Sequence, residues 1–395
     1  MSLDLTRHFS IFRAAAPARI HLAAHSHHYW PDAACRAHQE AVHQAARHAD
    51  DKWSSVFEDL IPRVRRGIGR ILNLPDARTV AFAPNTHELV CRLMSALPIA
   101  RPPRVLTSDA EFHSFERQIA RLAEEDLVAV ERVAAEPATT FAERFRAAAQ
   151  RGGHDLIFVS QVFYNSGATC GDVAAIVQSV PSADAFIAID GYHGFMALPT
   201  DLAEVAARIF YVAGGYKYAM AGEGACFMHC PPGYAPRPRD TGWFAGFDTL
   251  ADGTSGQVAY GSDGSRFMGA TFDPTALHRL AAVFAWMDEI GLSVAAIHAH
   301  VLSLQALFLE LVDAAAIDPL RRARLVTPTS TAERGHFLCY ETPDAASIHA
   351  RLAQAGIVTD VRGARIRFGF GCYHTEDDIE AAVTAMARAL GRGHL

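Results

Sequence analysis

Hydrophobic residues in the middle of the chain fall into short continuous runs separated by amphipathic stretches. The runs lie at 79–83, 104–107, 127–130, 156–159, 185–189, 209–212 and 225–228. Continuous apolar runs are typical of strands that are buried on both faces of a sheet. Segments with helical periodicity lie between them, at 88–97, 114–122, 140–150 and 173–180. Strands interleaved with helices predict an α/β domain with a mostly parallel sheet flanked by helices.

The two ends of the chain have a different pattern. Near the N-terminus, a loop is followed by predicted helices from residue 31 to about 50 and from 62 to 72. Towards the C-terminus, residues 230–275 are rich in Gly, Pro, Asp and Ser, which predicts long irregular connections. The remaining pattern predicts helices at 274–289, 293–315, 345–355 and 375–390, and strands at 335–341, 357–361 and 364–369. We therefore expect an N-terminal arm at 1–60, a large domain at 61–290 and a small α+β domain at 291–395.

Composition and charge narrow the class of protein. The 395 residues are half hydrophobic and 20% charged, with a formal net charge of −7. These values are ordinary for a globular protein and argue against a nucleic-acid partner. We see no apolar run near the ~18–20 residues of a membrane helix, and no signal peptide. The seven cysteines are scattered without a C-x-x-C pair, which indicates free thiols in a reducing cytoplasm.

The densest chemical signal is the segment from Val212 to Gly224, in which Lys217 stands between glycine pairs. A lysine that follows a parallel strand lies where α/β folds bind their ligands. A desolvated lysine can lose its proton and form a Schiff base. The plainer interpretation is a lysine on a surface loop.

Asp190 ends the preceding predicted strand, and His193 follows it. A carboxylate at this place can face the same crevice as Lys217. Pyridoxal phosphate (PLP) needs such a carboxylate to keep its ring nitrogen protonated, so that the ring can accept electrons. The alternatives are a turn aspartate and a structural histidine. Further upstream, Thr86 has N-cap chemistry at the start of a helix whose free N–H groups can hold a phosphate.

Taken together, these segments resemble the fold-type I PLP enzymes of the class V aminotransferase family, and within that family kynureninase. The resemblance is carried mainly by Asp190 with His193 and by Tyr216-Lys217-Tyr218. It extends through Ser160, Val162, Tyr164, Ser166 and Gly167, through Glu111 to Ser114, and through Gly242-Trp243-Phe244 and Arg266-Phe267. It covers about residues 15–390, and it implies a large PLP-binding domain with a small C-terminal α+β domain.

The resemblance also implies roles for single residues. Lys217 would bind the cofactor and later move the α-proton, Asp190 would pair with the ring nitrogen, and Phe112 would stack on the ring. His193 would lie near the ring and move protons. The phosphate would be held by Asn85, Thr86, His87 and Tyr216, with Trp243 and Thr271 added across the interface of a homodimer with shared active sites.

A C-terminal arginine strand offers a site for the substrate carboxylate, because the planar guanidinium binds carboxylates bidentately. We favour Arg367. Arg365 has the same strand parity and remains open, and Arg362 is a more distant candidate. The substrate is therefore expected to be a small-molecule amino acid.

The sequence departs from kynureninase near the expected substrate side chain. His25 and Ser26 stand in a histidine-rich stretch where that family has Asn-Ser-Leu-Gly. Gln161 stands where that family usually has His or another polar residue. We assign His25, Ser26 and Gln161 to the substrate pocket, and the alternative for the histidine-rich stretch is a solvent-facing loop. We expect no metal, because no matching Cys or carboxylate set accompanies the histidines. These changes leave several reactions open: kynureninase-like Cβ–Cγ hydrolysis or a related lyase step, class V transamination, or β-elimination of the cysteine desulfurase type with Cys372. A non-catalytic binding role is a further alternative.

Overall fold

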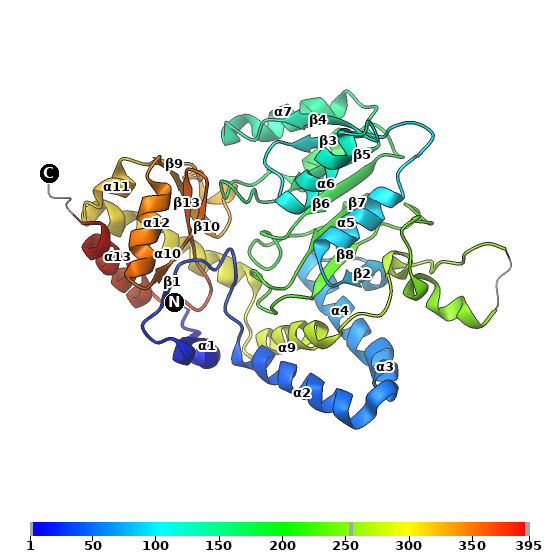
Figure 1. Cartoon of the computed structure of the whole chain (residues 1–395), viewed down its shortest axis with the longest axis horizontal. Helices are drawn as coiled ribbons and strands as arrows, with labels where there is room; N and C mark the ends of the chain where they lie inside the picture. Colours follow the sequence, from blue (N-terminus) through cyan, green and yellow to red (C-terminus); the bar gives the residue numbers. More distant parts are fainter. Residues whose placement is uncertain (1–2, 253–255, 392–395) are drawn as a thin grey trace.

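The computed structural model describes residues 3–252 and 256–391, and its largest element is a seven-stranded sheet (Figure 1). Its strands are β2 (Val80–Ala83), β3 (Arg104–Ser108), β4 (Ala129–Val133), β5 (Leu156–Ser160), β6 (Phe186–Asp190), β7 (Ile209–Ala213) and β8 (Cys226–His229). They are arranged in the order β2-β8-β7-β6-β5-β3-β4. Only β8 runs against the others, since it pairs antiparallel with both β2 and β7. The prediction of a mostly parallel sheet is confirmed.

All seven apolar runs of the sequence form strands of this sheet. In β2, β5, β7 and β8 every residue is buried, which is the expected result of covering both faces. The edge strand β4 is the least well predicted, because it begins two residues later than its apolar run. Leu127, which opens that run, is half exposed.

Helices flank the sheet as the periodicity predicts. They are α4 (Ile61–Leu72), α5 (Thr86–Ser95), α6 (His113–Ala123), α7 (Ala138–Gln150), α8 (Val173–Ser179) and α9 (Thr275–Glu289). Gly67 lets α4 and α9 approach closely, because an added Cβ would lie 2.1 Å from the ring of Phe284.

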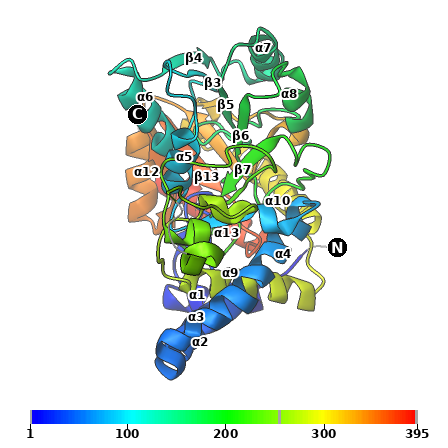
Figure 2. The ribbon, with the colours of Figure 1, turned by 90° about the vertical axis from the view of Figure 1, so that its right-hand side faces the viewer.

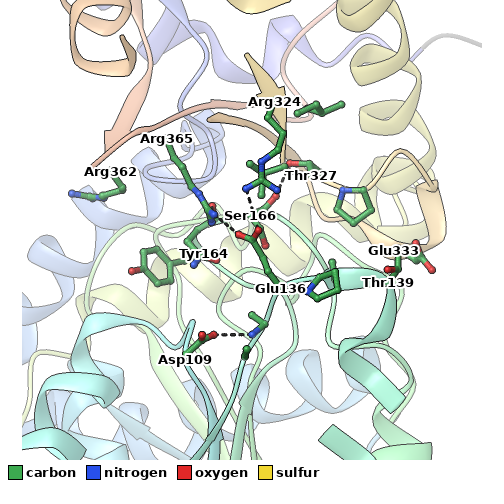
Figure 3. Close-up of a pocket in the computed structure, with 18 of the residues that line it drawn as sticks. Asp109, Glu136, Thr139, Tyr164, Ser166, Arg324, Thr327, Glu333, Arg362 and Arg365 are labelled. Atoms are coloured by element: carbon green, nitrogen blue, oxygen red, sulfur yellow. Dashed lines mark hydrogen bonds and ion pairs between the residues drawn. The ribbon is translucent and has the colours of Figure 1, made fainter. Parts of the chain in front are cut away.

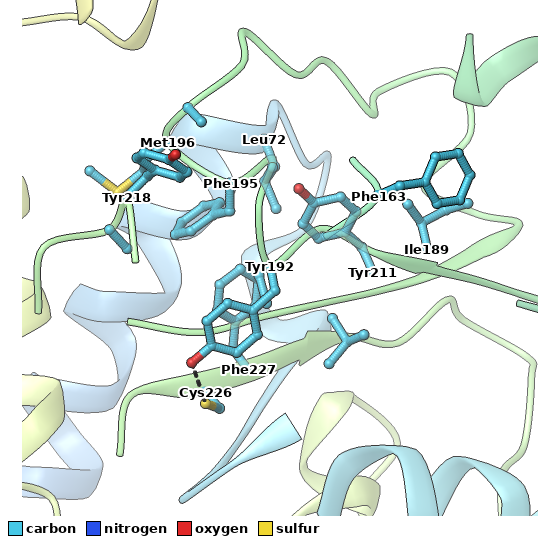
Figure 4. Close-up of a cluster of buried hydrophobic side chains, with 14 of the residues drawn as sticks. Leu72, Phe163, Ile189, Tyr192, Phe195, Met196, Tyr211, Tyr218, Cys226 and Phe227 are labelled. Carbon is cyan, nitrogen blue, oxygen red and sulfur yellow. Dashed lines mark hydrogen bonds between the residues drawn. The ribbon is translucent and has the colours of Figure 1, made fainter. Parts of the chain in front are cut away.

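Aromatic side chains pack around β7 and β8, at the strand ends that carry the predicted site (Figure 4). Tyr211 and Phe227 are fully buried, and the rings of Phe195 and Phe227 lie 4.8 Å apart. Each such ring contributes on the order of 2–3 kcal/mol by leaving water. This packing holds the backbone on both sides of Lys217 in place.

The small domain is a four-stranded antiparallel sheet covered by helices. Its strands β9 (Arg324–Leu325), β10 (Phe337–Glu341), β12 (Asp360–Arg362) and β13 (Arg365–Gly369) lie in the order β12-β13-β10-β9. Its helices are α10 (Val294–Ala314), α11 (Asp318–Arg321), α12 (Ala345–Gln354) and α13 (Glu376–Leu390). The predicted α+β character of this region is confirmed.

The N-terminal segment joins the two domains (Figures 1 and 2). After α1 (Ser10–Ala15), the short strand β1 (Ile20–His21) pairs with β11 (Ile357–Val358) of the small domain. The long helix α2 (Asp32–His48) then packs along α9, and α3 (Lys52–Ser55) leads on towards α4. The segment between β1 and α2 therefore passes from one domain to the other. The exact domain boundaries remain a prediction.

The expectation that no apolar segment approaches the length of a membrane helix is wrong for one helix. Helix α10 has 21 residues and a mean hydropathy of 1.5, so by length and composition it could cross a membrane. About a third of its most apolar stretch is buried, and the buried side chains, among them Ile297, Val301 and Phe308, lie on one face of the helix. Phe308 is fully buried, and its ring lies 5.2 Å from that of Phe368 on β13. The buried face of α10 thus packs against the small-domain sheet.

Candidate active site

A cavity of about 180 Å³ lies at the carboxyl ends of the parallel strands, and we call it the inner cavity. Eight of the predicted cofactor residues line it: Asn85, Thr86, His87, Phe112, Asp190, His193, Tyr216 and Lys217. They come from four separate stretches of the chain, following β2, β3, β6 and β7. Because parallel strands end at a common edge, segments distant in sequence meet here.

Lys217 is the central group of the inner cavity. Its side chain is 5% exposed, and Nζ lies 2.9 Å from Nε2 of His193. Burial lowers the pKa of Lys217 to about 7, with the negative charge of Asp190 opposing the shift. Burial also lowers the pKa of His193 well below its ordinary value, so that its neutral ring can accept a hydrogen bond from Nζ. A large share of Lys217 is therefore unprotonated near neutral pH.

Asp190 stands at the end of β6, between Ser160 of β5 and Val212 of β7. One carboxylate oxygen accepts a hydrogen bond of 2.9 Å from the backbone N–H of Tyr192. Burial raises the pKa of Asp190, while Lys217 acts in the opposite direction. No side chain of the described residues donates a hydrogen bond to this carboxylate, so it can serve a ligand.

A second buried acid, Glu111, lies close enough to Asp190 for their charges to interact, and the sequence marked it only as part of the segment from Glu111 to Ser114. Both of its oxygens accept hydrogen bonds, one from the hydroxyl of Ser108 and one from that of Ser160. Burial raises its pKa to about 7, and the charge of Asp190 adds to the increase. Glu111 thereby ties the ends of β3 and β5 together directly before Phe112.

The helix start at one end of the inner cavity differs from the prediction by one residue. Asn85, rather than Thr86, caps α5, since its side-chain oxygen accepts a hydrogen bond of 2.9 Å from the N–H of Glu88. Thr86 is the first residue of the helix, and its hydroxyl makes no cap. The hydroxyl and the first N–H groups of α5 can therefore serve an anion.

Two predicted phosphate ligands lie away from the inner cavity of this chain. Trp243 is 44% exposed, and Thr271 is exposed as well. The ring of Trp243 lies 4.2 Å from that of Phe244 and 5.5 Å from that of Phe247, in an aromatic cluster that also contains Trp53 and Phe57. Their predicted contact with a second subunit's cofactor stays a prediction.

The two candidate arginines of β13 have different surroundings. Arg365 donates to Glu136 and Glu341, and its side chain is 18% exposed. It lines an outer cavity of about 1160 Å³ between the domains, together with Arg324, Arg362 and Glu136 (Figure 3). Arg367 is 4% exposed and forms an ion pair of 2.9 Å with Asp360. Its guanidinium lies 6.0 Å from the ring of Tyr164, which lines the inner cavity, and its positive charge acts on Lys217, His193 and His25. Arg367 thus lies next to the inner cavity without lining it.

The predicted substrate residues have mixed placements, and none of them lines the inner cavity as described. His25 is fully buried and stacked 4.8 Å from Phe337, with no hydrogen bond at either ring nitrogen. Ser26 is only half-buried, and its hydroxyl lies 3.3 Å from Nδ1 of His27. The amide of Gln161 is hydrogen-bonded to Thr200 and Tyr211. His25 therefore keeps free polar atoms near Arg367, whereas Gln161 is used within the fold.

Cys372 is placed unlike a nucleophile. It is 1% exposed, and its sulfur lies 3.6 Å from that of Met220. Burial raises its pKa to about 12, so the reactive thiolate is suppressed. Among the described residues, no group of three or more His, Cys, Asp or Glu side chains could hold a metal ion.

Comparison with known proteins confirms the resemblance and the fold. The family model of the kynureninase C-terminal domain matches residues 297–386. Kynureninase of Deinococcus radiodurans is 31% identical over 242 residues, which are 60% of this chain and 57% of that protein. Kynureninase of Pseudomonas fluorescens is 28% identical over 246 residues, 60% of this chain and 56% of that protein. The matched part of the chain thus spans little more than half of either relative.

Solved structures of low sequence identity share the whole fold. A mutant of C-DES with glycine covalently linked to its PLP cofactor has a TM-score of 0.79 at 15% identity, covering 96% of this chain and 98% of that one. The cysteine desulfurase CsdA of Escherichia coli has a TM-score of 0.75 at 18% identity, covering 96% and 98%. At these identities the likeness concerns the fold, and the predicted fold-type I architecture is confirmed.

Proposed function

We propose that this protein is a PLP-dependent enzyme that acts on an α-amino acid by kynureninase-like chemistry, hydrolysing a Cβ–Cγ bond beside a carbonyl. The observation that carries the proposal is the inner cavity, in which the buried Lys217 faces His193 with Asp190 nearby. The similarity to kynureninases supports the choice of reaction. The family-model match covers residues 297–386 and so does not include Lys217 or Asp190, and the reaction is tested below by its product.

The residues present fit PLP. Lys217 offers an unprotonated amine for covalent attachment, and Asp190 offers a carboxylate without a side-chain donor for the ring nitrogen. Phe112 offers an aromatic wall, with its ring centre 5.2 Å from Nζ of Lys217. Thr86, His87 and Tyr216 would hold the phosphate at the start of α5. When bound, PLP accepts the electrons released as bonds at the substrate Cα break.

The chain's own residues would perform the proton transfers and the binding. Nζ of Lys217, with its pKa near 7, is suited to take the proton from the substrate Cα and return it. His193 accepts a hydrogen bond from Nζ and thus orients it. Arg367 would bind the α-carboxylate, and His25, with both ring nitrogens unpaired, would meet a polar substrate group. Ser26 and Gln161 stay assigned to the substrate pocket from the sequence alone.

A desulfurase-type reaction at Cys372 is disfavoured, because a buried thiol with a raised pKa supplies little thiolate. Transamination and β-elimination need the same Lys217, Asp190 and Arg367, so they are distinguished from hydrolysis by product and not by these residues.

We further propose a homodimer with shared active sites in the cytoplasm. The exposed Trp243 and Phe247 form an aromatic surface that a second copy would cover, placing Trp243 and Thr271 near the partner's phosphate site. All seven cysteines are free, which fits a reducing compartment. Light scattering on the PLP-loaded protein would give the mass of the assembly.

The test of function adds L-kynurenine to the PLP-loaded protein and follows anthranilate by fluorescence. Turnover with anthranilate release is expected. A change in cofactor absorbance without anthranilate would contradict the hydrolysis and point to another amino acid.

The chain contains only two lysines, Lys52 and Lys217, which gives this test a matched control. Borohydride reduction followed by peptide mass spectrometry should label Lys217 with the cofactor and leave Lys52 unlabelled. Lys217→Ala should lose this label and at least about 10²–10⁴-fold in kcat, the usual size of a lost proton transfer. Lys52→Ala should behave as wild type. Label on Lys52, or full activity without Lys217, would contradict the assignment.

A further inference from the structure

The guanidinium of Arg367 is bound at two of its nitrogens and unbound at the third. Nη2 lies 2.9 Å from Oδ2 of Asp360, and Nη1 donates to the backbone carbonyl of Tyr164. Nε is buried and has no hydrogen-bond partner among the described residues. A buried donor without an acceptor is unfavourable, so the edge that carries Nε is suited to an incoming acceptor.

Asp360 reaches Arg367 because of the register between two strands. The two residues are directly paired on β12 and β13 of the small domain, and their side chains are 10% and 4% exposed. Asp360 also lies 3.4 Å from Nε of Arg362, whose side chain is half exposed. The acid is therefore held between a buried and an exposed arginine, and its shorter contact is to the buried one.

We propose that Asp360 is a positioning residue: it fixes the Arg367 guanidinium so that the Nε edge is presented to the carboxylate of the amino-acid substrate. This inference rests on the proposed function. An arginine side chain has several rotatable bonds, and ordering it when the ligand binds reduces affinity. Asp360 and the Tyr164 carbonyl order the group beforehand, one from the small domain and one from the large domain. The carboxylate then binds to a fork that already points in one direction.

The opposite role for Asp360 makes a different prediction. If Asp360 were a competitor that occupies the arginine in place of the substrate, its removal would strengthen amino-acid binding. If Asp360 positions Arg367, its removal weakens binding. The sign of the change in affinity therefore decides between the two roles.

Arg365 supplies the matched control on the same strand. Its cross-strand partner on β10 is Glu341, and Nε of Arg365 lies 2.9 Å from Oε2 of that acid. Removing Glu341 thus breaks an arginine–carboxylate contact two residues along β13, beside the outer cavity, and leaves Arg365 its second acid partner, Glu136. Any general effect of losing such a pair would appear in both variants.

The experiment measures binding of L-alanine and of L-kynurenine to the PLP-loaded protein through the change in cofactor absorbance. Asp360→Ala should weaken binding of both by tenfold or more, and Asp360→Asn, which retains an acceptor for Nη2, by about threefold. Glu341→Ala should stay within twofold of wild type. PLP affinity should be unchanged in all variants, and KM for the turned-over substrate should rise more than kcat falls. If Asp360→Ala does not fold, the binding of both amino acids to Asp360→Asn still shows whether the affinity falls or rises.

Equal or tighter amino-acid binding by the Asp360 variants would overturn the proposal, as would a parallel loss of PLP affinity. Arg367→Ala, measured alongside, separates this failure from that of the proposed function. If Arg367→Ala leaves amino-acid binding unchanged, the carboxylate site itself is wrongly assigned, and Asp360 has no such role. If Arg367→Ala weakens binding and Asp360→Ala does not, only the positioning role is refuted.

Discussion

The outer and inner cavities have the same kinds of charged residue nearby, but the charged groups differ in how completely they are paired. At the outer cavity, Arg324 and Arg365 both pair with Glu136, which lines it (Figure 3), and with Glu341 beside it. The two arginine side chains are 55% and 18% exposed. Next to the inner cavity, Arg367 has one acid partner and an unpaired Nε. The outer pairs are solvated and mutually neutralised, whereas the inner groups are dry and incompletely paired.

This difference shows where binding energy is available. An exposed ion pair is already satisfied by its partner and by water, so a ligand gains little by replacing either. A buried group with an unused donor or acceptor gains a strong interaction from a ligand that supplies the missing atom. Cavity size alone would select the outer cavity, which is the larger of the two. The chemistry selects the inner cavity with Lys217.

The sharpest test of this comparison replaces each of the two arginines of β13 in turn by alanine. Arg367→Ala should weaken amino-acid binding by about 10–10²-fold, because charge-assisted hydrogen bonds contribute about 1.5–3 kcal/mol. Arg365→Ala should change it by less than threefold, since its guanidinium serves Glu136 and Glu341. Titration of the PLP-loaded variants with L-alanine measures both. A larger loss in Arg365→Ala would reverse the comparison.

A smaller effect is expected at Glu111, through the pH dependence of stability. Its pKa is about 7 when folded and near 4.5 when unfolded, so the folded protein holds this proton more tightly. The stability contributed by Glu111 is therefore complete below pH 4.5 and is lost as the pH rises to about 7. Glu111→Gln cannot lose this proton, so its unfolding free energy should not fall in this way. The difference between the variant and wild type should therefore shift in favour of the variant by on the order of 1–3 kcal/mol from pH 5 to pH 8. Urea unfolding at both pH values checks this, and parallel pH curves for the two proteins would contradict it.

The smallest effect is expected from the outer ion pairs. Glu136 is 41% exposed, so Glu136→Gln should cost at most about 1 kcal/mol of unfolding free energy, and less at high salt. Its effect on amino-acid affinity should lie within twofold. A tenfold loss of affinity in this variant would mean that the outer cavity takes part in substrate binding, and the distinction between the cavities would fail.

The sequence by itself determined the architecture of the large sheet and the position, at one edge of it, of the two central groups of the candidate site. The inner strands were recognisable as continuous apolar runs, because burial on both faces leaves no place for polar side chains, whereas the edge strand β4 is partly exposed and was predicted less well. Lys217 and Asp190 were found because the ends of parallel strands meet at one edge, so position along the chain implies proximity.

Only the tertiary structure decided between side chains that share a local pattern. Arg365 and Arg367 lie on the same side of one strand, but they are about 7 Å apart along it, enough to place them in different surroundings. Glu111, Gln161 and Asp360 likewise obtain their partners from other strands, at sequence distances of 49, 50 and 7 residues. Whether a polar group is paired depends on which distant residue folding brings to it, and no local pattern of residues contains that information.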